Sequence, residues 1–286
     1  MRPLRPLLCL LAALPLALAA CGDDDPAEGG APGTISFTTY GEDYIEQQIP
    51  AEDVEDGWAI TYDKFLIVLG RVRVATAGGE LGGEMGGSTL FNLKTPGQKP
   101  VASFEVPSRT WDAVSYQIGP LDGSTQLGPG ATEADRALLS APNASVYAAG
   151  SATKGGVTKT FKWLFVKPTL LESCEGEKDG REVLGAAVTA GNADPIELTI
   201  HGDHLFYDDL QSPEAKLRFD AIAAADANND DEVTLDELRA VPLSSLTVGT
   251  YGTGSADIND LGAFVEALSQ TLGHFRGEGE CRSRSI

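Results

Sequence analysis

Short runs in which apolar and polar residues alternate occupy most of the chain between residues 34 and 201, with Gly, Pro and Asp between them. Alternation over four to eight residues is typical of strands that bury one face. Clear examples lie at 58–62, 65–74, 111–118, 145–149, 158–166, 183–189 and 196–200. About nine strands joined by turns every ~8–12 residues predict a β-sandwich.

The periodicity changes in the last third of the chain. Ser212-Pro213-Glu214 combines a hydroxyl cap, a proline suited to a first turn and an acid favoured by the helix dipole, and predicts a helix over 213–225. An apolar stripe predicts a second, amphipathic helix over 259–272. The members of the stripe are Leu261, Phe264, Val265, Leu268 and Leu272.

Strands that come first and helices that come last indicate segregated elements, in contrast to the alternation of a parallel doubly wound sheet. We therefore predict a mainly β fold of the α+β class. Its β-sandwich covers residues 34–206, and a helical region covers residues 207–286. Hydrophobic residues make up 42% of the chain, which is enough to build a core.

The first 20 residues are predicted to be a secretion signal. Two arginines precede a Leu- and Ala-rich run over 7–20 that is shorter than the ~20 residues needed to span a bilayer. The end of this run, Leu-Ala-Ala-Cys at 18–21, resembles the lipobox of bacterial lipoproteins. The resemblance implies cleavage before Cys21, acylation of Cys21 and a lipid anchor in a membrane of the cell envelope, on its periplasmic side or at the cell surface. An ordinary signal peptide cut after residue 20 is the alternative.

Residues 21–33 form the predicted tether behind the lipid anchor. After Cys21 they include four acids, two prolines and four glycines, a composition that cannot bury an apolar face. Removal of the signal also removes two arginines and lowers the formal net charge from −21 to −23.

Two cysteines remain for the folded part of the chain. Of the four in the sequence, Cys9 lies in the predicted signal and Cys21 is the predicted lipid attachment site, which leaves Cys174 and Cys281. In an oxidising envelope compartment these two are predicted to form a disulfide. The alternative is two free thiols, and the acidic flanks of both would disfavour the thiolate that a nucleophile requires.

Residues 226–237, Asp-Ala-Asn-Asn-Asp-Asp-Glu-Val-Thr-Leu-Asp-Glu, resemble the calcium-binding loop of the EF-hand family at every ligand position. Ca²⁺ takes ~6–8 oxygen ligands, and a loop of ~12 residues can wrap them around one ion. The resemblance implies Ca²⁺ as cofactor, with these ligands: Asp226, Asn228, Asp230, the backbone carbonyl of Glu232, Thr234 directly or through water, and both carboxylate oxygens of Glu237.

The loop departs from the family pattern in two ways. Asp231 takes the sixth position, where the family has glycine because the backbone there is left-handed. A partner loop is also missing from the sequence, although Val233 at the eighth position normally pairs with one. A lone site is expected to bind Ca²⁺ at ~10⁻⁴–10⁻³ M and to act as a structural clamp. The alternative is an acidic helix-turn-helix that binds no ion.

A second candidate metal site involves histidines. His201, Asp203 and His204 offer imidazole and carboxylate ligands that suit Zn²⁺ or Cu²⁺. Residues three apart on a strand point to opposite faces, so His201 and His204 converge only if Gly202 permits a bend.

His274, the third and last histidine of the chain, joins them only if the terminal helix packs against this junction. A disulfide between Cys174 and Cys281 would favour that packing. The alternative is a purely structural junction, in which His204 and Asp208 form hydrogen bonds with loop backbone groups.

Charge and motifs exclude some functions and leave others open. With 42 acidic against 21 basic residues, the chain lacks the basic surface that binding to a nucleic-acid backbone requires. Common hydrolase motifs are missing, so we assign no catalytic residue and expect no enzyme. The sequence favours a lipid-anchored envelope protein that binds calcium as a structural or binding module. A Zn²⁺- or Cu²⁺-binding envelope protein is the alternative, and an envelope hydrolase is a more distant one.

Overall fold

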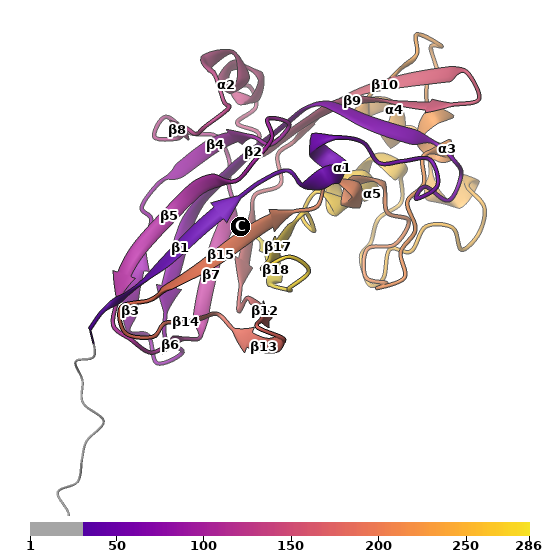
Figure 1. The fold of residues 1–286 in the computed structure, drawn as a ribbon. Coiled ribbons are helices and arrows are strands. Elements are labelled where there is room, and N and C mark those ends of the chain that lie inside the picture. The colour runs from indigo at the N-terminus through magenta and orange to yellow at the C-terminus, as the bar shows by residue number, and fades with distance from the viewer. Residues whose placement is uncertain (1–30) are drawn as a thin grey trace, which may run out of the picture.

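The computed structural model describes residues 31–286. The predicted signal peptide, Cys21 and most of the predicted tether lie outside the described residues. Within residues 31–286, no helix combines the length and the apolar composition needed to cross a membrane. Figure 1 shows two large β-sheets, with α3, α4 and α5 gathered at one end.

The larger sheet has ten strands, seven of them on one hydrogen-bonded path. In order across the sheet these are β16 (Glu232–Val233), β10 (Val157–Phe165), β9 (Val146–Lys154), β2 (Ala59–Ala75), β7 (Ala113–Ile118), β11 (Thr169–Glu172) and β18 (Arg282–Ser285). The other three are β3 (Leu81–Glu84) and β4 (Ser88–Asn92), which pair with β2, and β8 (Gln126–Leu127), which pairs with β4. The long strand β2 pairs with β9 through its first half and with β7 through its second half.

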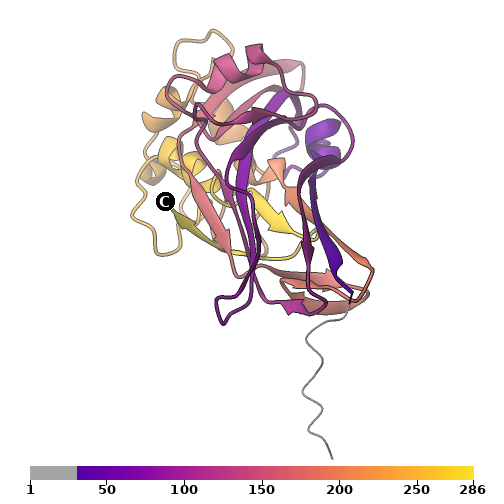
Figure 2. The same ribbon diagram turned by 90° about the vertical axis from the view of Figure 1, so that its left-hand side faces the viewer.

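The smaller sheet has four strands. In order they are β17 (Gly273–Phe275), β15 (Ala193–Ile200), β1 (Gly33–Thr39) and β5 (Lys99–Val106). β1 is parallel to β15 and antiparallel to β5. Figure 2 shows the two sheets side by side, with β1 in the smaller and the long β2 in the larger. Every second residue of β1 is buried, as expected for a strand with one face on a core.

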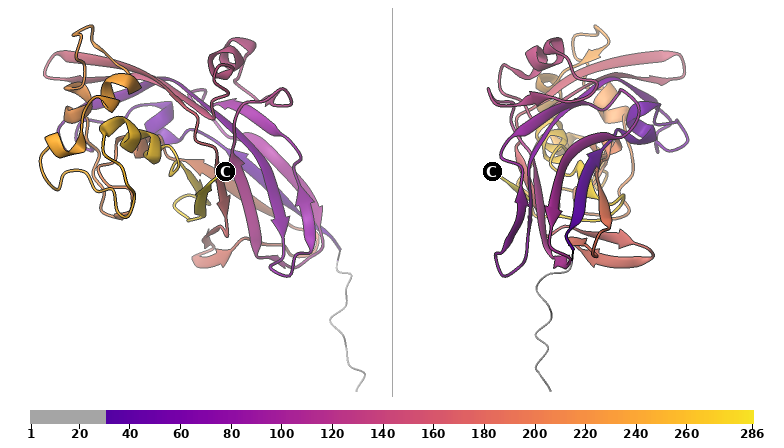
Figure 3. Two further views of the ribbon diagram at one scale, coloured as in Figure 1. Left: turned by 180° about the vertical axis from the view of Figure 1, so that it is seen from behind. Right: turned by 60° about the vertical axis from the view of Figure 1, so that its left-hand side comes forward.

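Short helices and hairpins complete the described part of the chain. The helices are α1 (Glu42–Glu46), α2 (Glu133–Leu139), α3 (Asp220–Ala223), α4 (Leu235–Arg239) and α5 (Leu261–Leu268), with the 3₁₀ helices η1 (Gly202–Phe206) and η2 (Leu243–Ser245). Two small pairs are formed by β12 (Glu175–Lys178) with β13 (Arg181–Leu184) and by β6 (Thr110–Trp111) with β14 (Ala186–Ala187). Seen from behind in Figure 3, the β9–β10 hairpin extends over the end that carries α3, α4 and α5.

A group of buried aromatic side chains joins the larger sheet to the helical end of the molecule. We call it the aromatic group, and it consists of Tyr62, Phe161, Trp163, Phe206 and Phe219. The centroids of rings in contact lie 4.7–6.4 Å apart. Tilted and edge-to-face pairs of this kind contribute about 0.5–1.5 kcal/mol each beyond their area burial. Phe206 is the last residue of η1, so this packing fixes η1 against β10.

The prediction of a mainly β fold with a helical C-terminal part is confirmed. Beyond that prediction, the C-terminal part also supplies strands. β16 pairs with β10, β17 with β15 and β18 with β11. Side chains from both sides of position 206 belong to one hydrophobic core, so region 207–286 folds against the sheets and shares their interior.

The predicted helix over 213–225 is wrong for most of its length. Only α3, Asp220–Ala223, is helical there. The reason is Asp56, whose Oδ2 accepts hydrogen bonds from the backbone N–H groups of Phe219 and Asp220 at 2.8 and 2.7 Å. This carboxylate caps the chain at the start of α3, and Ser212 does not.

The predicted terminal helix is present with shorter bounds, as α5. Asp260 caps it by accepting a hydrogen bond from the Ala263 N–H at 2.8 Å. All members of the predicted apolar stripe are buried, including Leu272, which lies beyond the end of the helix. The hydrophobic pattern therefore predicted which side chains enter the core, and the cap set where the helix begins.

Cys174 and Cys281 form the predicted disulfide. It joins the chain just after β11 to the chain just before β18, and these two strands pair antiparallel from Thr169–Ser285 to Glu172–Arg282. Cys174 is fully buried in the core. The bond therefore holds the C-terminal strand against the larger sheet.

Removing this disulfide should destabilise the protein. The bond closes a loop between residues 107 apart, and loop-closure entropy assigns about 5 kcal/mol to a loop of that size. We expect the double variant Cys174→Ala/Cys281→Ala to lose up to about 5 kcal/mol of its free energy of unfolding, measured by urea denaturation followed by circular dichroism. A double variant with an unchanged urea midpoint would contradict this.

Candidate metal centre

All three histidines of the chain converge beside η1. The ring centroids of His201 and His204 lie 5.3 Å apart, those of His201 and His274 4.4 Å, and those of His204 and His274 5.0 Å. Each of the three residues is only 6–8% exposed. We call this set the histidine cluster. Ligand atoms of His201 and His204 lie within 4.8 Å of each other, and so do those of His201 and His274, so His201 is common to both pairs.

The pairing of β15 with β17 brings His201 and His274 to one face. Thr199 of β15 lies opposite His274 of β17, and residues opposite each other share a face. His201 follows Thr199 by two residues with an extended backbone, so it points to the same side. Its N–H donates a hydrogen bond to the carbonyl of Leu272 at 2.9 Å, which continues the ladder. His274 thus reaches the cluster on strand β17, and α5 packs against η1 beside it.

The bend required at Gly202 is present, and it brings His204 to the cluster. Gly202 is the first residue of η1, where a Cβ atom would lie 2.5 Å from Ile45 Cγ1, so a larger residue does not fit. The hydroxyl of Tyr62 donates a hydrogen bond to the Gly202 carbonyl at 2.6 Å. Phe206 then anchors the other end of η1 in the aromatic group. Both ends of the turn that carries His204 are therefore fixed.

Hydrogen bonds determine which nitrogen His204 offers. Its Nδ1 lies 3.0 Å from Thr271 Oγ1, and this hydroxyl donates its only proton to the carbonyl of Leu268 at 2.9 Å. The hydroxyl must therefore accept from His204, which assigns the imidazole proton to Nδ1. Nε2 of His204 keeps a lone pair for a metal ion.

His201 and His274 each carry a buried nitrogen without a hydrogen-bond partner among residues 31–286. These atoms are Nε2 of His201 and Nδ1 of His274. On the other side of the His201 ring, Nδ1 lies 3.5 Å from Oε2 of Glu42, and a carboxylate in that position orients an imidazole for metal binding. An unpaired buried polar atom costs about 1–3 kcal/mol, so a partner for these two nitrogens would stabilise the cluster.

Burial keeps two of the histidines in the neutral form that binds metals. Burial, and then the neighbouring His274 and His201, lower the pKa of His204 to about 3. Burial, and then His201, lower the pKa of His274 to about 4. Both imidazoles are therefore uncharged near pH 7, with a lone pair available.

Two carboxylates lie within reach of the rings. Ligand atoms within 4.8 Å of one another form two sets, His201 with Asp203 and His204, and His201 with His274 and Glu278. Asp203 is buried, and burial raises the pKa of its carboxyl group. Glu278 is exposed at the molecular surface. An ion between the rings could thus take an additional oxygen ligand from the interior or from the surface.

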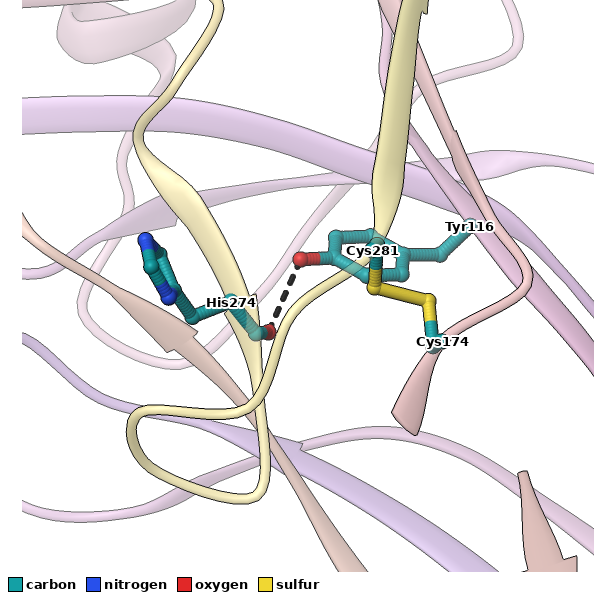
Figure 4. Close-up of a disulfide and its surroundings, with 4 residues drawn as sticks. All are labelled: Tyr116, Cys174, His274 and Cys281. Carbon is teal, nitrogen blue, oxygen red and sulfur yellow. Dashed lines mark hydrogen bonds between the residues drawn. A yellow bond between two sulfur atoms is a disulfide. The ribbon is translucent and has the colours of Figure 1, made fainter. Parts of the chain in front are cut away.

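The segment that carries His274 is held by the larger sheet. The Tyr116 hydroxyl donates a hydrogen bond to the His274 carbonyl at 2.9 Å, as Figure 4 shows. The same figure shows the bond between Cys174 and Cys281 beside this segment, with the His274 ring extending away from it. The backbone of His274 is therefore fixed while its ring is free to face the cluster.

A buried ion pair fixes the same segment to β15. The Asp194 carboxylate accepts hydrogen bonds from Arg276 at 2.7 Å, from Lys178 at 2.8 Å and from the Ala187 N–H at 3.0 Å. Burial by itself would raise the pKa of Asp194, but these donors outweigh it and the pKa is lowered. Arg276 directly follows β17, so the ion pair keeps His274 close to His201.

Replacing Asp194 by Asn should destabilise the protein by about 3–5 kcal/mol, because Arg276 stays buried without its counter-charge. The pKa of Asp194 is lowered on folding. Its contribution is therefore complete above the unfolded pKa of about 3.9 and disappears as the pH falls through the folded value. Urea denaturation at several pH values should show the difference from the parent protein shrinking below pH ~4.

The matched control is Glu172→Gln. Glu172 pairs with Arg282 and Arg284, whose side chains are 71% and 56% exposed. An exposed pair contributes less than about 1 kcal/mol, so this variant should differ little from the parent. Equal losses in the Asp194 and Glu172 variants would contradict the role of the buried pair.

The predicted calcium loop connects α3 to α4, and its turns are held by hydrogen bonds from backbone N–H groups to its own carboxylates. The Asp226 carboxylate accepts hydrogen bonds from the N–H groups of Asp230 at 3.2 Å and Asp231 at 3.1 Å. Asp230 accepts one from the Glu232 N–H at 2.9 Å. Asn229 and Asp231 have φ angles of 60° and 64°. The left-handed turn at the sixth position thus forms with Asp in place of Gly.

The predicted calcium loop pairs with β10 through Glu232 and Val233. Val233 is buried and pairs in parallel with Phe161 of β10. The Trp163 indole donates a hydrogen bond to the Val233 carbonyl at 2.9 Å. Thr234 caps the N-terminus of α4 and exchanges hydrogen bonds with Glu237. The main sheet therefore supports the loop without a partner loop.

Lys159 of β10 brings a positive charge to the loop. Its ammonium group lies 2.6 Å from Asp226 Oδ2 and 2.8 Å from Asp231 Oδ1. The hydrogen bond from Lys159 holds the pKa of Asp226 below its usual value. Asp231 at the sixth position thus has a charge partner, which a glycine would lack. Within residues 31–286, three or more ligand atoms of acids and histidines lie within 4.8 Å of one another only at the histidine cluster. The carboxylates of the loop do not form such a set.

The alternative of a purely structural junction describes Asp208, which forms hydrogen bonds with its neighbours in the loop. Asp208 accepts hydrogen bonds from the Lys216 N–H at 2.8 Å and from Arg218 Nε at 2.7 Å. His204, in contrast, contacts a side chain, that of Thr271. Three neighbours of the cluster were not predicted because each lies in a segment without a local motif. They are Glu42, Thr271 and Glu278.

Comparisons with known proteins leave the family open. No protein-family model and no curated protein matches the chain. Among solved structures, MbnP from Methylosinus trichosporium is similar with a TM-score of 0.27 and 10% sequence identity, over 60% of this chain and 76% of that chain. A TM-score this low assigns neither a fold nor an activity, so the function rests on the residues of the sites.

Proposed function

We propose that this protein binds one divalent transition-metal ion, Cu²⁺ or Zn²⁺, through His201, His204 and His274. The supporting observation is that three buried imidazoles converge and that two of them carry an unpartnered buried nitrogen. A histidine of an ordinary core uses its nitrogens in hydrogen bonds, because an unpaired polar group in the interior is costly. One metal ion bound to the cluster would give both unpartnered nitrogens a ligand bond.

The ligand types favour particular ions. Imidazole suits both copper and zinc, and the general affinity order for divalent ions places Cu²⁺ above Zn²⁺ at a given site. Asp203 or Glu278 would add a carboxylate ligand. Thr271 and Glu42 would hold two of the rings in the orientation that presents Nε2 to the ion.

Metal titration tests this proposal. We expect one equivalent of Cu²⁺, or more weakly of Zn²⁺, to bind to protein purified without a histidine tag, measured by isothermal titration calorimetry. His274→Gln should lower the affinity at least about 100-fold, because it removes a direct ligand whereas loss of an outer partner already costs ~10–100-fold. His201→Ala/His274→Ala should abolish binding.

The control for these variants is Glu105→Gln, an exposed residue of β5. It should bind both metals as the parent does. Absence of a binding heat in the parent protein, or equal binding by the double histidine variant, would contradict the proposal.

We also propose that the loop at 226–237 binds Ca²⁺. The resemblance of residues 226–237 to an EF-hand loop supports it, together with the hydrogen bonds of the Asp226 carboxylate and the pairing of Val233 with β10. Lys159 occupies one side of Asp226 and would compete with the ion. Binding would therefore be weak, as expected for a lone site, and the ion would act as a clamp between α3, α4 and β10.

Removing the competing ammonium group should strengthen Ca²⁺ binding. Lys159→Met should raise the Ca²⁺ affinity roughly tenfold, since a lysine a few Å from a divalent ion repels it. Glu237→Gln should abolish binding and the Ca²⁺-dependent rise in melting temperature. Both are measured by calorimetry and thermal denaturation after treatment with a chelator.

Lys162→Met is the matched control for Lys159. Lys162 lies on the same strand and contacts the Glu232 side chain, whereas the predicted ligand of Glu232 is its backbone carbonyl. The control should change the Ca²⁺ affinity much less than Lys159→Met does. Equal affinities in the parent and the Lys159 variant would show that the ammonium group does not compete.

The sequence and the disulfide also bear on where in the cell both metal sites would lie. We propose that the protein is a lipoprotein anchored through Cys21 to a membrane of the cell envelope. The lipobox-like sequence at 18–21 supports this, and so does the disulfide between Cys174 and Cys281, since such bonds persist in oxidising compartments. Both metal sites would then meet the metal ions of the envelope compartment.

A further inference from the structure

A pocket of about 460 Å³ opens beside the histidine cluster, and His204 and His274 form part of its lining. The remaining walls come from residues 207–215, from the turn after α5 and from residues 278–283. His201 does not line the pocket, so the cluster lies at its inner end. A volume of this size falls within the ~300–1,000 Å³ of small-molecule sites.

The lining of the pocket is negatively charged. Asp209, Glu278 and Glu280 contribute carboxylates, and within residues 31–286 no lysine or arginine lines the pocket. Asp209 Oδ1 accepts hydrogen bonds from the N–H groups of Gln211 and Ser212, both at 2.7 Å, which hold its carboxylate in place. A cleft lined by one sign of charge repels small molecules of that sign. The pocket therefore disfavours anions and admits neutral or cationic molecules.

The other side of the cluster is occupied by protein. Glu42 Oε2 contacts the His201 ring, and the buried Asp203 belongs to the same set of ligand atoms. His204 and His274, in contrast, border both the cluster and the pocket. An ion held by the three rings would thus have protein on one side and the pocket on the other.

Building on the proposed transition-metal site, we propose that this pocket binds an exogenous ligand of the metal, and that this ligand is a neutral nitrogen donor of the imidazole class. Copper and zinc sites commonly leave one coordination position to an external molecule. An imidazole carries its donor nitrogen without negative charge. An anionic donor such as azide would have to approach past the three carboxylates.

The test uses the protein loaded with one equivalent of Cu²⁺ and titrated with imidazole or with azide. Electron paramagnetic resonance and visible absorption report a change of copper ligands. We expect imidazole to form a ternary complex and azide to require at least about tenfold higher concentrations. Asp209→Asn/Glu280→Gln should reduce the azide requirement about tenfold and leave the response to imidazole unchanged.

A second pair of variants tests the pocket itself. Ser283 of β18 lines the pocket and Arg284 does not, and neighbouring strand residues point to opposite faces. Ser283→Trp should fill the pocket and abolish the response to imidazole while one equivalent of Cu²⁺ still binds. Arg284→Trp should retain both the copper and the response.

The outcomes separate this inference from the proposed function. If Cu²⁺ binds through the histidines but does not respond to imidazole, or if imidazole removes the copper, the inference is overturned and the metal site stands. Equal responses to azide and imidazole, unchanged in Asp209→Asn/Glu280→Gln, would overturn it as well. Failure of the parent protein to bind Cu²⁺ would overturn the proposed function, and this inference with it.

Discussion

The antiparallel contact between β17 and β15 is the interaction on which the histidine cluster depends. It pairs only three residues of each strand, and so short a contact is not stable by itself. Its stability comes from groups around it: the buried ion pair of Asp194 with Arg276, the hydrogen bond from Tyr116 and the disulfide at Cys281. The ion pair belongs to the smaller sheet and the other two contacts to the larger. The cluster therefore forms where the C-terminal segment passes from one sheet, through β17, to the other, through β18.

The two proposed metal sites share a common support in the aromatic group. Phe206 ends the turn that carries His204, and its ring lies 6.0 Å from that of Trp163. Trp163 in turn holds the Val233 carbonyl of the predicted calcium loop. Close-packed interiors transmit displacements, because their side chains have few voids into which to relax. A change in the loop would therefore reach η1 through two side chains, which places both sites on one rigid part of the molecule.

Local patterns predicted much of the fold and a part of each site. Alternation predicted the strands, and the apolar stripe predicted which side chains of α5 are buried. Convergence of His201 and His204 required a bend at Gly202, and the structure has that bend in η1. What the sequence could not provide was contact between distant segments. The cap at Asp56 shortened a predicted helix, and the register of β17 brought His274 to the cluster. These contacts depend on how separate elements pair, and no local spacing encodes that pairing.

The negative charge of the chain acts differently at the two sites, and this difference governs which ion each would select. The loop gathers carboxylates, which are hard oxygen ligands suited to Ca²⁺. Lys159 balances part of their negative charge by pairing with Asp226 and Asp231. In the histidine cluster, burial keeps the imidazoles of His204 and His274 neutral, so these two rings lie close together without repelling each other. Imidazole nitrogen favours copper and zinc over calcium. Acidic residues near the cluster lie mostly at the surface of the pocket, where they would attract cations without adding oxygen ligands enough for calcium. The two sites would thus bind different ions from one solution, because the loop presents mainly carboxylate oxygens to its ion and the cluster presents mainly imidazole nitrogens.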